Sequence, residues 1–365
     1  MKKTKLLLLN LLFFAFLWGV LELLSWFIYK RLPDTHNGKM IVQSELGLPF
    51  NNSIRSILPH PYLLYVNNPQ YVDSIRQHNE WGYRNDPFPF KKDSGTLRVL
   101  LLGGSTTYGY LNKNPKTTWG HLLEQKLQQL TPQKVQVING GLNYGTSAEM
   151  LAGYMFRHRY LQPDWVIYHG GGNDASATVF PNYDPEYTHL RASGNKTNLR
   201  RFERRILRVS RFFRLLYAFW LSDMATVYQS QPGSFNSISY EEVKERIKNP
   251  AHYTGFERNI DLLTQTALHD GARVALVGYL HASIHKVEET RPDLAGIADL
   301  VIEAISRNKE LMRQVARKHN VPYINVDSST FRDELFLDNC HLNPEGEALK
   351  AAIIFEQLKP YFGGK

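Results

Sequence analysis

The chain has 365 residues, of which 43% are apolar and 21% are charged, so it can form one large domain or two small ones and is not disordered as a whole. Its formal net charge of +9 is compatible with nucleic acid, an anionic membrane surface or neither. The single cysteine, Cys340, excludes an intrachain disulfide and a zinc site built from several cysteines. There is no aromatic RNA-binding signature, so we expect no nucleic-acid partner.

The first predicted element is the apolar stretch 6–29, which exceeds the ~20 residues that a helix needs to span a bilayer. Three polar residues interrupt it: Asn10, Glu22 and Ser25. One carboxylate near an end of such a helix is tolerable, and more so if a partner helix covers it or if it is protonated and neutral. We therefore predict a transmembrane helix, which would bring the chain to a membrane through residues 6–29.

The residues around this stretch predict that the helix is an uncleaved anchor within residues 1–31. No small-x-small cleavage site follows it, and no cysteine follows it closely enough for lipid attachment. Lysines before the stretch favour a cytoplasmic N-terminus, although Lys30 and Arg31 reduce the asymmetry. We expect a single-pass protein of the cell membrane whose globular part lies on the extracytoplasmic, periplasmic side.

Residues 32–95 are rich in Asn, Pro, Asp and aromatic residues without sustained periodicity, and are interpreted as a juxtamembrane connecting region. From residue 96, short apolar runs alternate with helical stretches, which is typical of a parallel sheet covered on both faces. The predicted strands are 98–104, 135–141, 165–171, 273–280 and 321–327. The predicted helices are 118–130, 147–161, 256–269, 293–319 and 344–358.

The third and fourth predicted strands are too far apart for one crossover, so residues 178–254 are interpreted as an insertion in a domain that covers 96–365. Within it, residues 200–220 carry arginines and apolar side chains on different sides of a predicted helix. Such a helix packs on the core of the insertion or lies on an anionic membrane surface, and the sequence leaves both interpretations open.

Ser105 follows the first predicted strand after Gly103 and Gly104, where the chain can turn sharply. It is a turn residue, a helix cap or a nucleophile, and a nucleophile needs a base with an orienting acid. Asp338 lies three residues before His341, so its carboxylate can accept the Nδ1 proton and leave Nε2 to accept the Ser105 proton. A helix is expected to begin just after this pair.

The third predicted strand ends in three glycines that precede Asn173 and Asp174. The side-chain amide of Asn173 can donate to a developing oxyanion. The alternative is an ordinary turn in which Asp174 caps a helix. Before the first strand, Arg84 could bind an anionic group of a substrate, but a structural contact is the favoured interpretation.

Taken together, these stretches resemble the SGNH hydrolases, also called the GDSL esterase/lipase superfamily, over residues 96–360. The four blocks of that family read here, in chain order, GGSTTYG, INGGLNYGTS, GGND and DNCH. The resemblance implies a three-layer, flavodoxin-like α/β sandwich with a five-stranded parallel sheet. It implies Ser105 as nucleophile, His341 as general base and acid, and Asp338 as the residue that orients His341. The Ser105 backbone amide, Asn173 and one residue of the second block would form the oxyanion hole.

Two positions depart from the family pattern. Gly104 stands where the family name expects aspartate, a residue outside the triad, and this form resembles that of membrane-anchored bacterial members. In the second block, counting without a gap from Asn139 puts Tyr144 at the oxyanion position, and a shift of one residue puts Gly145 there. We choose Gly145, because a side chain would crowd the acyl oxygen, and Gly141 is the other candidate.

The function implied by the resemblance is that of a serine esterase that hydrolyses an O-acyl ester through an acyl-enzyme, with an O-acetyl ester as one candidate. By analogy with anchored relatives, an envelope carbohydrate is a candidate substrate. The alternatives are an O-acyltransferase that uses the same triad and a non-catalytic, membrane-tethered interaction protein that keeps the fold. We expect no cofactor and no metal.

Overall fold

The computed structural model describes residues 2–33, 36–46, 56–60, 62–190, 201–220 and 239–362. The chain forms two compact units. One contains Met1–Ile54 and Ser193–Gln229, and the other contains Arg55–Ala192 and Ser230–Lys365. The central part of the segment expected as an insertion therefore belongs with the N-terminal residues, and its two flanks belong with the larger unit.

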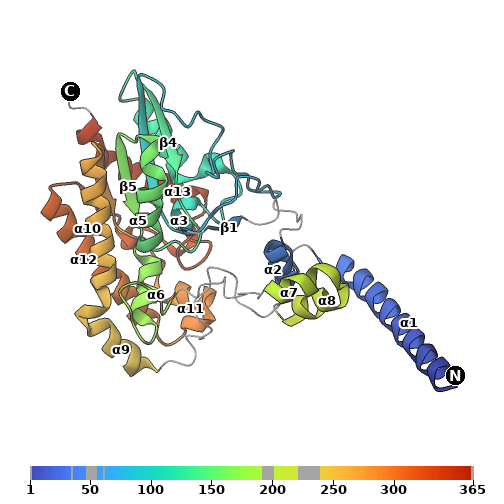
Figure 1. The fold of residues 1–365 in the computed structure, drawn as a ribbon. Helices are drawn as coiled ribbons and strands as arrows, with labels where there is room; N and C mark the ends of the chain where they lie inside the picture. Colours follow the sequence, from blue (N-terminus) through green and yellow to red (C-terminus); the bar gives the residue numbers. More distant parts are fainter. Residues whose placement is uncertain are drawn as a thin grey trace. The chain divides into compact units, whose positions relative to one another are not determined.

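The larger unit is built on a five-stranded parallel sheet with the strand order β4-β3-β5-β6-β7 (Figure 1). Its strands are β3 (Thr96–Gly103), β4 (Lys134–Asn139), β5 (Trp165–His169), β6 (Arg273–Val277) and β7 (Tyr323–Ile324). The predicted parallel sheet is confirmed, and each strand lies within or next to its predicted range. The order places the earliest strand in the interior of the sheet, as in flavodoxin-like folds.

The strand β3 shows why its sequence is a continuous apolar run. Val99 and Leu101 pack into the core on one face of the sheet, whereas Leu100 and Leu102 pack into the core on the other. All four side chains are fully buried. A strand that is covered on both faces has no polar side, so its pattern is continuous rather than alternating.

Helices cover both faces of this sheet (Figure 1). The helices α4 (Trp119–Gln128) and α13 (Pro344–Phe362) supply the core on the face of Leu101. The helices α5 (Ser147–Phe156), α10 (Thr254–His269) and α12 (Ala298–His319) supply the core on the opposite face. The predicted three-layer sandwich is confirmed.

Shorter elements lie around these layers. The helices are α3 (Ser105–Tyr108), α6 (Gly172–Val179), α9 (Tyr240–Lys248) and α11 (Ile284–Thr290). The 3₁₀ turns are η2 (Pro115–Thr117), η3 (His158–Leu161), η5 (Pro250–Tyr253), η6 (Pro292–Leu294), η7 (Ser328–Thr330) and η8 (Asp333–Leu335). A two-stranded antiparallel sheet, β1 (Ile57–His60) and β2 (Leu64–Asn67), precedes β3. Because α3 and α6 directly follow β3 and β5, both begin at the carboxyl edge of the main sheet.

Residues 62–95, which were predicted to belong to a connecting region, are part of the larger unit and pack on its core. Tyr83 and Phe88 are buried in the same core as Leu100. The buried Arg98 side chain of β3 donates to the carbonyl oxygens of Pro89 and Phe90, each at 3.0 Å. These contacts use single aromatic residues and backbone carbonyls, which produce no periodic pattern in the sequence.

The smaller unit contains α1 (Lys2–Arg31), α2 (Asn37–Leu46), α7 (Arg201–Val209) and α8 (Arg211–Trp220). Among the described residues, α1 is the one helix that is long and apolar enough to cross a membrane. The helix predicted over 200–220 is divided into α7 and α8 at Ser210, whose Oγ accepts the backbone N–H of Phe213 at 3.2 Å. Ser210 thus caps a new helix, as serine commonly does.

Candidate active site

Ser105 is the first residue of α3, directly after β3 and Gly104. A residue at this position of a helix has a backbone N–H without an intrahelical acceptor. The helix α3 has only one turn and ends at Gly109, where φ is +78°, a left-handed conformation that glycine adopts without strain. The sequence Gly-Gly-Ser-Thr-Thr-Tyr-Gly therefore presents Ser105 on a short turn at the carboxyl edge of the sheet.

Three side chains from distant parts of the sequence are joined by hydrogen bonds. The Oγ of Ser105 is 2.8 Å from Nε2 of His341, and Nδ1 of His341 is 2.7 Å from Oδ2 of Asp338. An ionised carboxylate can only accept, so Nδ1 donates to Asp338. Nε2 accepts the hydroxyl of Ser105 when the ring is neutral and donates to Oγ when the ring is protonated. The structure brings together the three residues predicted as a triad.

The loop that holds His341 is fixed by both oxygens of Asp338. While Oδ2 contacts the ring, Oδ1 accepts the backbone N–H groups of Cys340 and His341 at 2.9 and 2.8 Å. The backbone N–H of Leu337 donates to the carbonyl of His341 at 2.7 Å and closes the loop. The helix predicted to follow begins at Pro344. The ring of His341 therefore has little freedom to rotate away from Ser105.

The charges around His341 act on its pKa in opposite directions. Burial lowers the pKa, but Cys340 and the Asp338 carboxylate outweigh this effect and raise it from the usual 6.5 to about 10. Burial raises the pKa of Asp338, but its hydrogen bonds and the charge of His341 lower it below the ordinary value. The pair therefore favours a charged imidazolium beside an ionised carboxylate.

Asn173 is the second residue of α6 and faces the same cavity as Ser105. Its Nδ2 donates to the carbonyl of Gly145 at 2.8 Å. Gly145, the predicted oxyanion residue of the second block, has its own backbone N–H bonded to the carbonyl of Leu142 at 2.9 Å. The backbone N–H of Gly145 thus already has a hydrogen-bond acceptor. Gly145 contacts the site through its carbonyl oxygen, which orients the side chain of Asn173.

The residue after Asn173 connects the second and third blocks. The buried carboxylate of Asp174 accepts the backbone N–H and the hydroxyl of Ser147, at the start of α5, and the hydroxyl of Tyr187. Burial raises the pKa of Asp174 to about 6 although these donors favour the charged form. Asp174 therefore accepts the first backbone N–H of α5 and holds α6 against α5, so the capping role that the alternative assigned to Asp174 is found at a neighbouring helix.

A cavity of about 260 Å³ lies in front of the triad. Ser105, Asn173 and His341 line its polar side. Aliphatic side chains from α11, η6 and α12 also line the cavity: Val287, Leu294, Val301, Ile302 and Ile305. A polar reaction centre next to an apolar wall suits a molecule that has an ester group and an aliphatic part.

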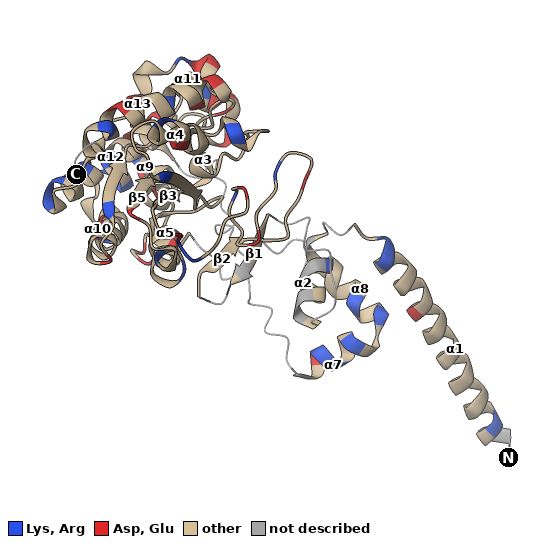
Figure 2. Ribbon diagram, turned by 90° about the horizontal axis from the view of Figure 1, so that it is seen from above, with Lys and Arg blue, Asp and Glu red and all other residues tan. Residues whose placement is uncertain are grey.

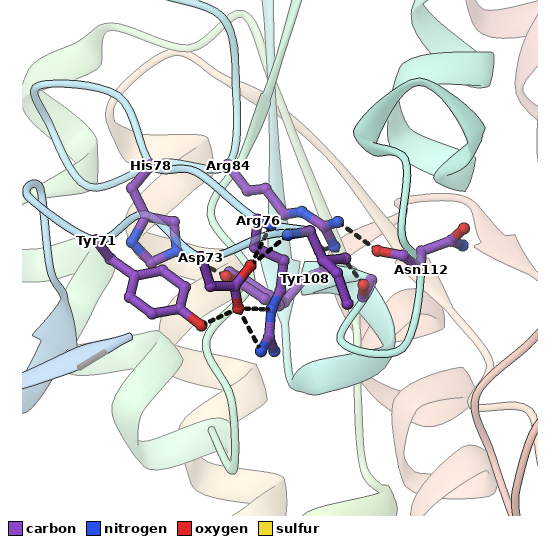
Figure 3. Close-up of polar contacts among 9 residues, drawn as sticks. Tyr71, Asp73, Arg76, His78, Arg84, Tyr108 and Asn112 are labelled. Atoms are coloured by element: carbon purple, nitrogen blue, oxygen red, sulfur yellow. Dashed lines mark hydrogen bonds and ion pairs between the residues drawn. The ribbon is translucent and has the colours of Figure 1, made fainter. Parts of the chain in front are cut away.

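Arg84 supports the turn that carries Ser105 (Figure 3). Its guanidinium donates to the carbonyls of Tyr108, at 3.2 Å, Asn112, at 2.5 Å, and Gly109. Arg84 is 4% exposed and contacts the end of α3, so the structural interpretation of this residue is the one that the structure supports. The sequence contains no local signal for this role, because the three acceptors are backbone atoms.

A second group of side chains lies beside Arg84 (Figure 3). His78 lies between the carbonyl of Asn68 and the hydroxyl of Tyr108, at 2.7 Å from each. Burial lowers the pKa of His78 to about 4, so the ring is neutral, donates to Asn68 and accepts from Tyr108. The guanidinium of Arg76 lies 5.0 Å from the ring centroid of Tyr110. Residues 68–84 thus contact residues 108–112, at the end of the turn that begins at Ser105.

Within the part of the chain that the structure describes, one group of side chains has its ligand atoms close enough to hold a metal ion, namely Asp338, Cys340 and His341. Two of these atoms already form the Asp338–His341 hydrogen bond. A metal ion bound there would take Nδ1 of His341 away from Asp338, so the arrangement is suited to proton transfer rather than to metal binding.

The model of the GDSL-like lipase/acylhydrolase family matches residues 101–349. No curated protein matches the sequence significantly.

Solved structures resemble the chain at low sequence identity. A lipase/acylhydrolase from Enterococcus faecalis is 17% identical, and the likeness covers 72% of this chain and 96% of that one with a TM-score of 0.41. An acylhydrolase from Bacteroides fragilis, described as putative, is 13% identical, with coverages of 74% and 91% and a TM-score of 0.42. An acetylxylan esterase from Geobacillus stearothermophilus, solved as a catalytic mutant, is 14% identical, with coverages of 73% and 94% and a TM-score of 0.40.

We predict that Arg84→Ala lowers the free energy of unfolding of the larger unit by about 3 kcal/mol, because buried carbonyls at the end of α3 lose a charged donor. Thermal denaturation of the full-length protein in detergent, followed by circular dichroism, measures the effect. Arg159→Ala is the matched control, since Arg159 is a partly exposed partner of Asp270 and such pairs contribute about 0–1 kcal/mol. Equal losses in the two variants would contradict the role of Arg84.

Proposed function

The chain belongs to the GDSL-like lipase/acylhydrolase family, and from this premise we propose that it is a serine esterase that hydrolyses an O-acyl ester through an acyl-enzyme on Ser105. The observation that carries the proposal is the uninterrupted pair of hydrogen bonds from Ser105 through the ring of His341 to Asp338. Nucleophile, base and orienting acid are thus in contact without any rearrangement.

In the first half of the proposed reaction, Ser105 attacks the ester carbonyl. Nε2 of the neutral His341 takes the hydroxyl proton while Oγ forms a bond to the carbonyl carbon. The carboxylate of Asp338 stabilises the resulting imidazolium. Nε2 then returns the proton to the leaving oxygen, the C–O bond of the ester breaks, and the alcohol departs. The acyl group remains on Ser105.

In the second half, water takes the place of the alcohol. His341 accepts a proton from the water, the oxygen attacks the acyl carbon, and the bond to Ser105 breaks as the proton returns to Oγ. A carboxylic acid leaves and the free enzyme is restored. If the hydroxyl of an acceptor replaces water, the same acyl-enzyme gives acyl transfer, so analysis of the products separates the two reactions.

The oxyanion of each tetrahedral intermediate needs donors that do not move during the reaction. We propose the backbone N–H of Ser105 and the side-chain amide of Asn173 for this role. One hydrogen of that amide donates to the carbonyl of Gly145, and an amide carries a second one. A backbone donor at Gly145 would require exchange of its present bond to Leu142, so we propose that Gly145 positions Asn173.

We also propose that α1 anchors the esterase in the cell membrane, with the larger unit on the extracytoplasmic side. The length and apolar composition of α1 support the anchor, and the lysines before its apolar stretch support the orientation. Esters of envelope carbohydrates are the substrates that this position makes accessible, and an O-acetyl ester is the simplest of them.

We predict that Ser105→Ala abolishes the hydrolysis of p-nitrophenyl acetate and that His341→Ala has nearly the same effect. Because nucleophile and base act as one unit, the double variant should lose little more than either single variant. Initial rates measured on the detergent-solubilised full-length protein give the comparison. Substantial hydrolysis by Ser105→Ala would show that another residue is the nucleophile.

We predict that kcat/KM rises with pH with a midpoint above 6.5, because only neutral His341 accepts the proton of Ser105 and its pKa is raised. Cys340→Ser removes an ionisable neighbour that raises this pKa, so the midpoint should move to lower pH. Asp338→Asn should also lower the midpoint, and in addition it should lower the maximal rate because the ring loses its orienting acceptor. An unchanged midpoint in Cys340→Ser would contradict the prediction that Cys340 raises the pKa of His341.

We predict that Gly104→Asp, which restores the residue expected from the family name, lowers kcat by about 10²–10³-fold, the usual cost of losing an oxyanion donor. A Cβ at position 104 would lie 2.8 Å from Nδ2 of Asn173 and 3.2 Å from the carbonyl of Gly145, so Asn173 must move. Adding Gly104→Asp to Asn173→Ala should cost little more than Asn173→Ala alone. Full activity of Gly104→Asp, or full additivity of the two changes, would argue against this explanation.

A further inference from the structure

Glu22, one of the three polar residues in the apolar stretch of α1, contacts the start of α8. The carboxylate of Glu22 accepts the backbone N–H groups of Arg211, at 2.5 Å, and Phe212, at 3.3 Å, and it also accepts the hydroxyl of Ser210. The first N–H groups of a helix have no intrahelical acceptor and favour a negative charge. Glu22 therefore caps α8.

Aromatic contacts place the start of α8 beside the apolar part of α1. The ring of Trp18 lies 5.8 Å from that of Phe212 and 6.1 Å from that of Phe213, and the guanidinium of Arg211 lies 5.5 Å from the ring of Trp26. Glu22 is seven residues before the end of the apolar stretch 6–29, which at 1.5 Å per residue is about 10 Å along the helix. Helices that lie in a membrane interface are buried to about 5–10 Å.

The helices α7 and α8 expose many large apolar side chains for a pair of short helices. Val209 is 84% exposed and Trp220 is 70% exposed. The other exposed members are Phe202, Ile206, Leu216 and Phe219. Together these six side chains are called the apolar surface of α7 and α8. On a water-exposed helix pair, such a surface is normally covered by a partner or by lipid.

The charged residues of the same two helices are almost all basic (Figure 2). The described arginine side chains of α7 and α8 belong to Arg204, Arg205, Arg208, Arg211 and Arg214, and Glu203 is the single acidic residue of the two helices. The guanidinium of Arg214 donates to the backbone carbonyls of Leu207 and Arg208. Arginine combines with phosphate through paired hydrogen bonds, and its aliphatic stem tolerates an apolar surrounding. A surface that joins apolar side chains and arginines matches the boundary between acyl chains and phosphate groups.

We propose that α7 and α8 lie in the interface of a phospholipid bilayer beside α1, with their apolar surface among the acyl chains and their arginines at the phosphate groups. The contact between Glu22 and α8 determines how deep α7 and α8 lie in the bilayer, because it joins them to α1 seven residues before the end of its apolar stretch. The helix α1 is then a retained part of a folded unit and not a removable leader, since its removal would take away the carboxylate that accepts the backbone N–H groups of Arg211 and Phe212. This inference is independent of the ester chemistry at Ser105.

The test uses the full-length protein in liposomes of phosphatidylcholine and phosphatidylglycerol. In a Cys340→Ser background, single cysteines replace Val209, Leu9 and Leu262, and each carries a bimane label. Leu9 on α1 is the lipid-exposed reference, and Leu262, 41% exposed on α10, is the reference in the larger unit. All three sites are exposed, so labelling leaves the fold intact, and circular dichroism checks this. Quenching by doxyl-labelled lipid and by aqueous iodide is then measured.

The label at position 209 is expected to behave like that at position 9, with strong quenching by doxyl lipid and little by iodide, whereas the label at 262 shows the reverse. Strong iodide quenching at 209 without lipid quenching would overturn the proposal, because the surface would then be in water. Protection from both quenchers would also overturn it, because the surface would then be covered by protein, such as a second copy of the chain. Glu22→Ala should increase iodide quenching at 209, whereas Ser25→Ala, one turn away, should not.

Discussion

The hydrogen bond between Ser105 Oγ and His341 Nε2 joins residues 236 positions apart in the chain, and the arrangement of the rest of the site follows from it. It forms only if the end of β3 and the loop before α13 meet at the same edge of the sheet. Parallel strands provide this, because the right-handed crossovers return every strand in the same direction and collect the carboxyl ends on one side.

Each end of this hydrogen bond is held in place by further hydrogen bonds. On the serine side, Arg84 binds three carbonyls at the end of α3, and residues 68–84 pack against the same turn. On the histidine side, Asp338 contacts the ring and two backbone N–H groups of its own loop. In the proposed reaction, a site held in this way does not have to reorganise when substrate binds, which is the basis of electrostatic catalysis.

Buried charged side chains also connect neighbouring segments of the larger unit through hydrogen bonds to backbone groups. Asp174 and Arg84 are both removed from water. Asp174 accepts from a backbone N–H and from side-chain hydroxyls, whereas Arg84 donates to backbone carbonyls. The carboxylate of Glu347 likewise accepts the backbone N–H of Trp119 and so connects α13 to the start of α4. Loss of one partner would leave a buried charge uncompensated, which is far more costly than loss of a surface pair. In the smaller unit, the carboxylate of Glu22 likewise accepts a backbone N–H at the start of α8.

Much of the architecture was predictable from the sequence. The apolar runs that become β3 to β7, the helices between them and the start of α13 after Asn343 follow from local periodicity, glycine and proline positions, and burial on both sheet faces. The order of the four blocks placed Ser105 and Asn173 at the ends of predicted strands, and Asp338 and His341 past the last one. Their catalytic roles remain predictions that the geometry makes testable. The membrane span over residues 6–29 also remains a prediction.

Other features depended on tertiary contacts that leave no periodic trace. The choice among the residues of the second block depends on which backbone N–H already has an acceptor, and only the fold shows that the N–H of Gly145 is bonded to Leu142. The role of Arg84 depends on carbonyls at 108, 109 and 112, which every residue type carries. Likewise, α7 and α8 pack beside α1 and not with the flanks of the predicted insertion. This follows from the contact of Glu22 with the start of α8, which lies 188 residues or more further along the chain. Sequence patterns determined the elements and the residue types at the strand ends, whereas long-range hydrogen bonds to backbone groups decided how they meet, because such bonds depend on position in space and not on the identity of the partner side chain.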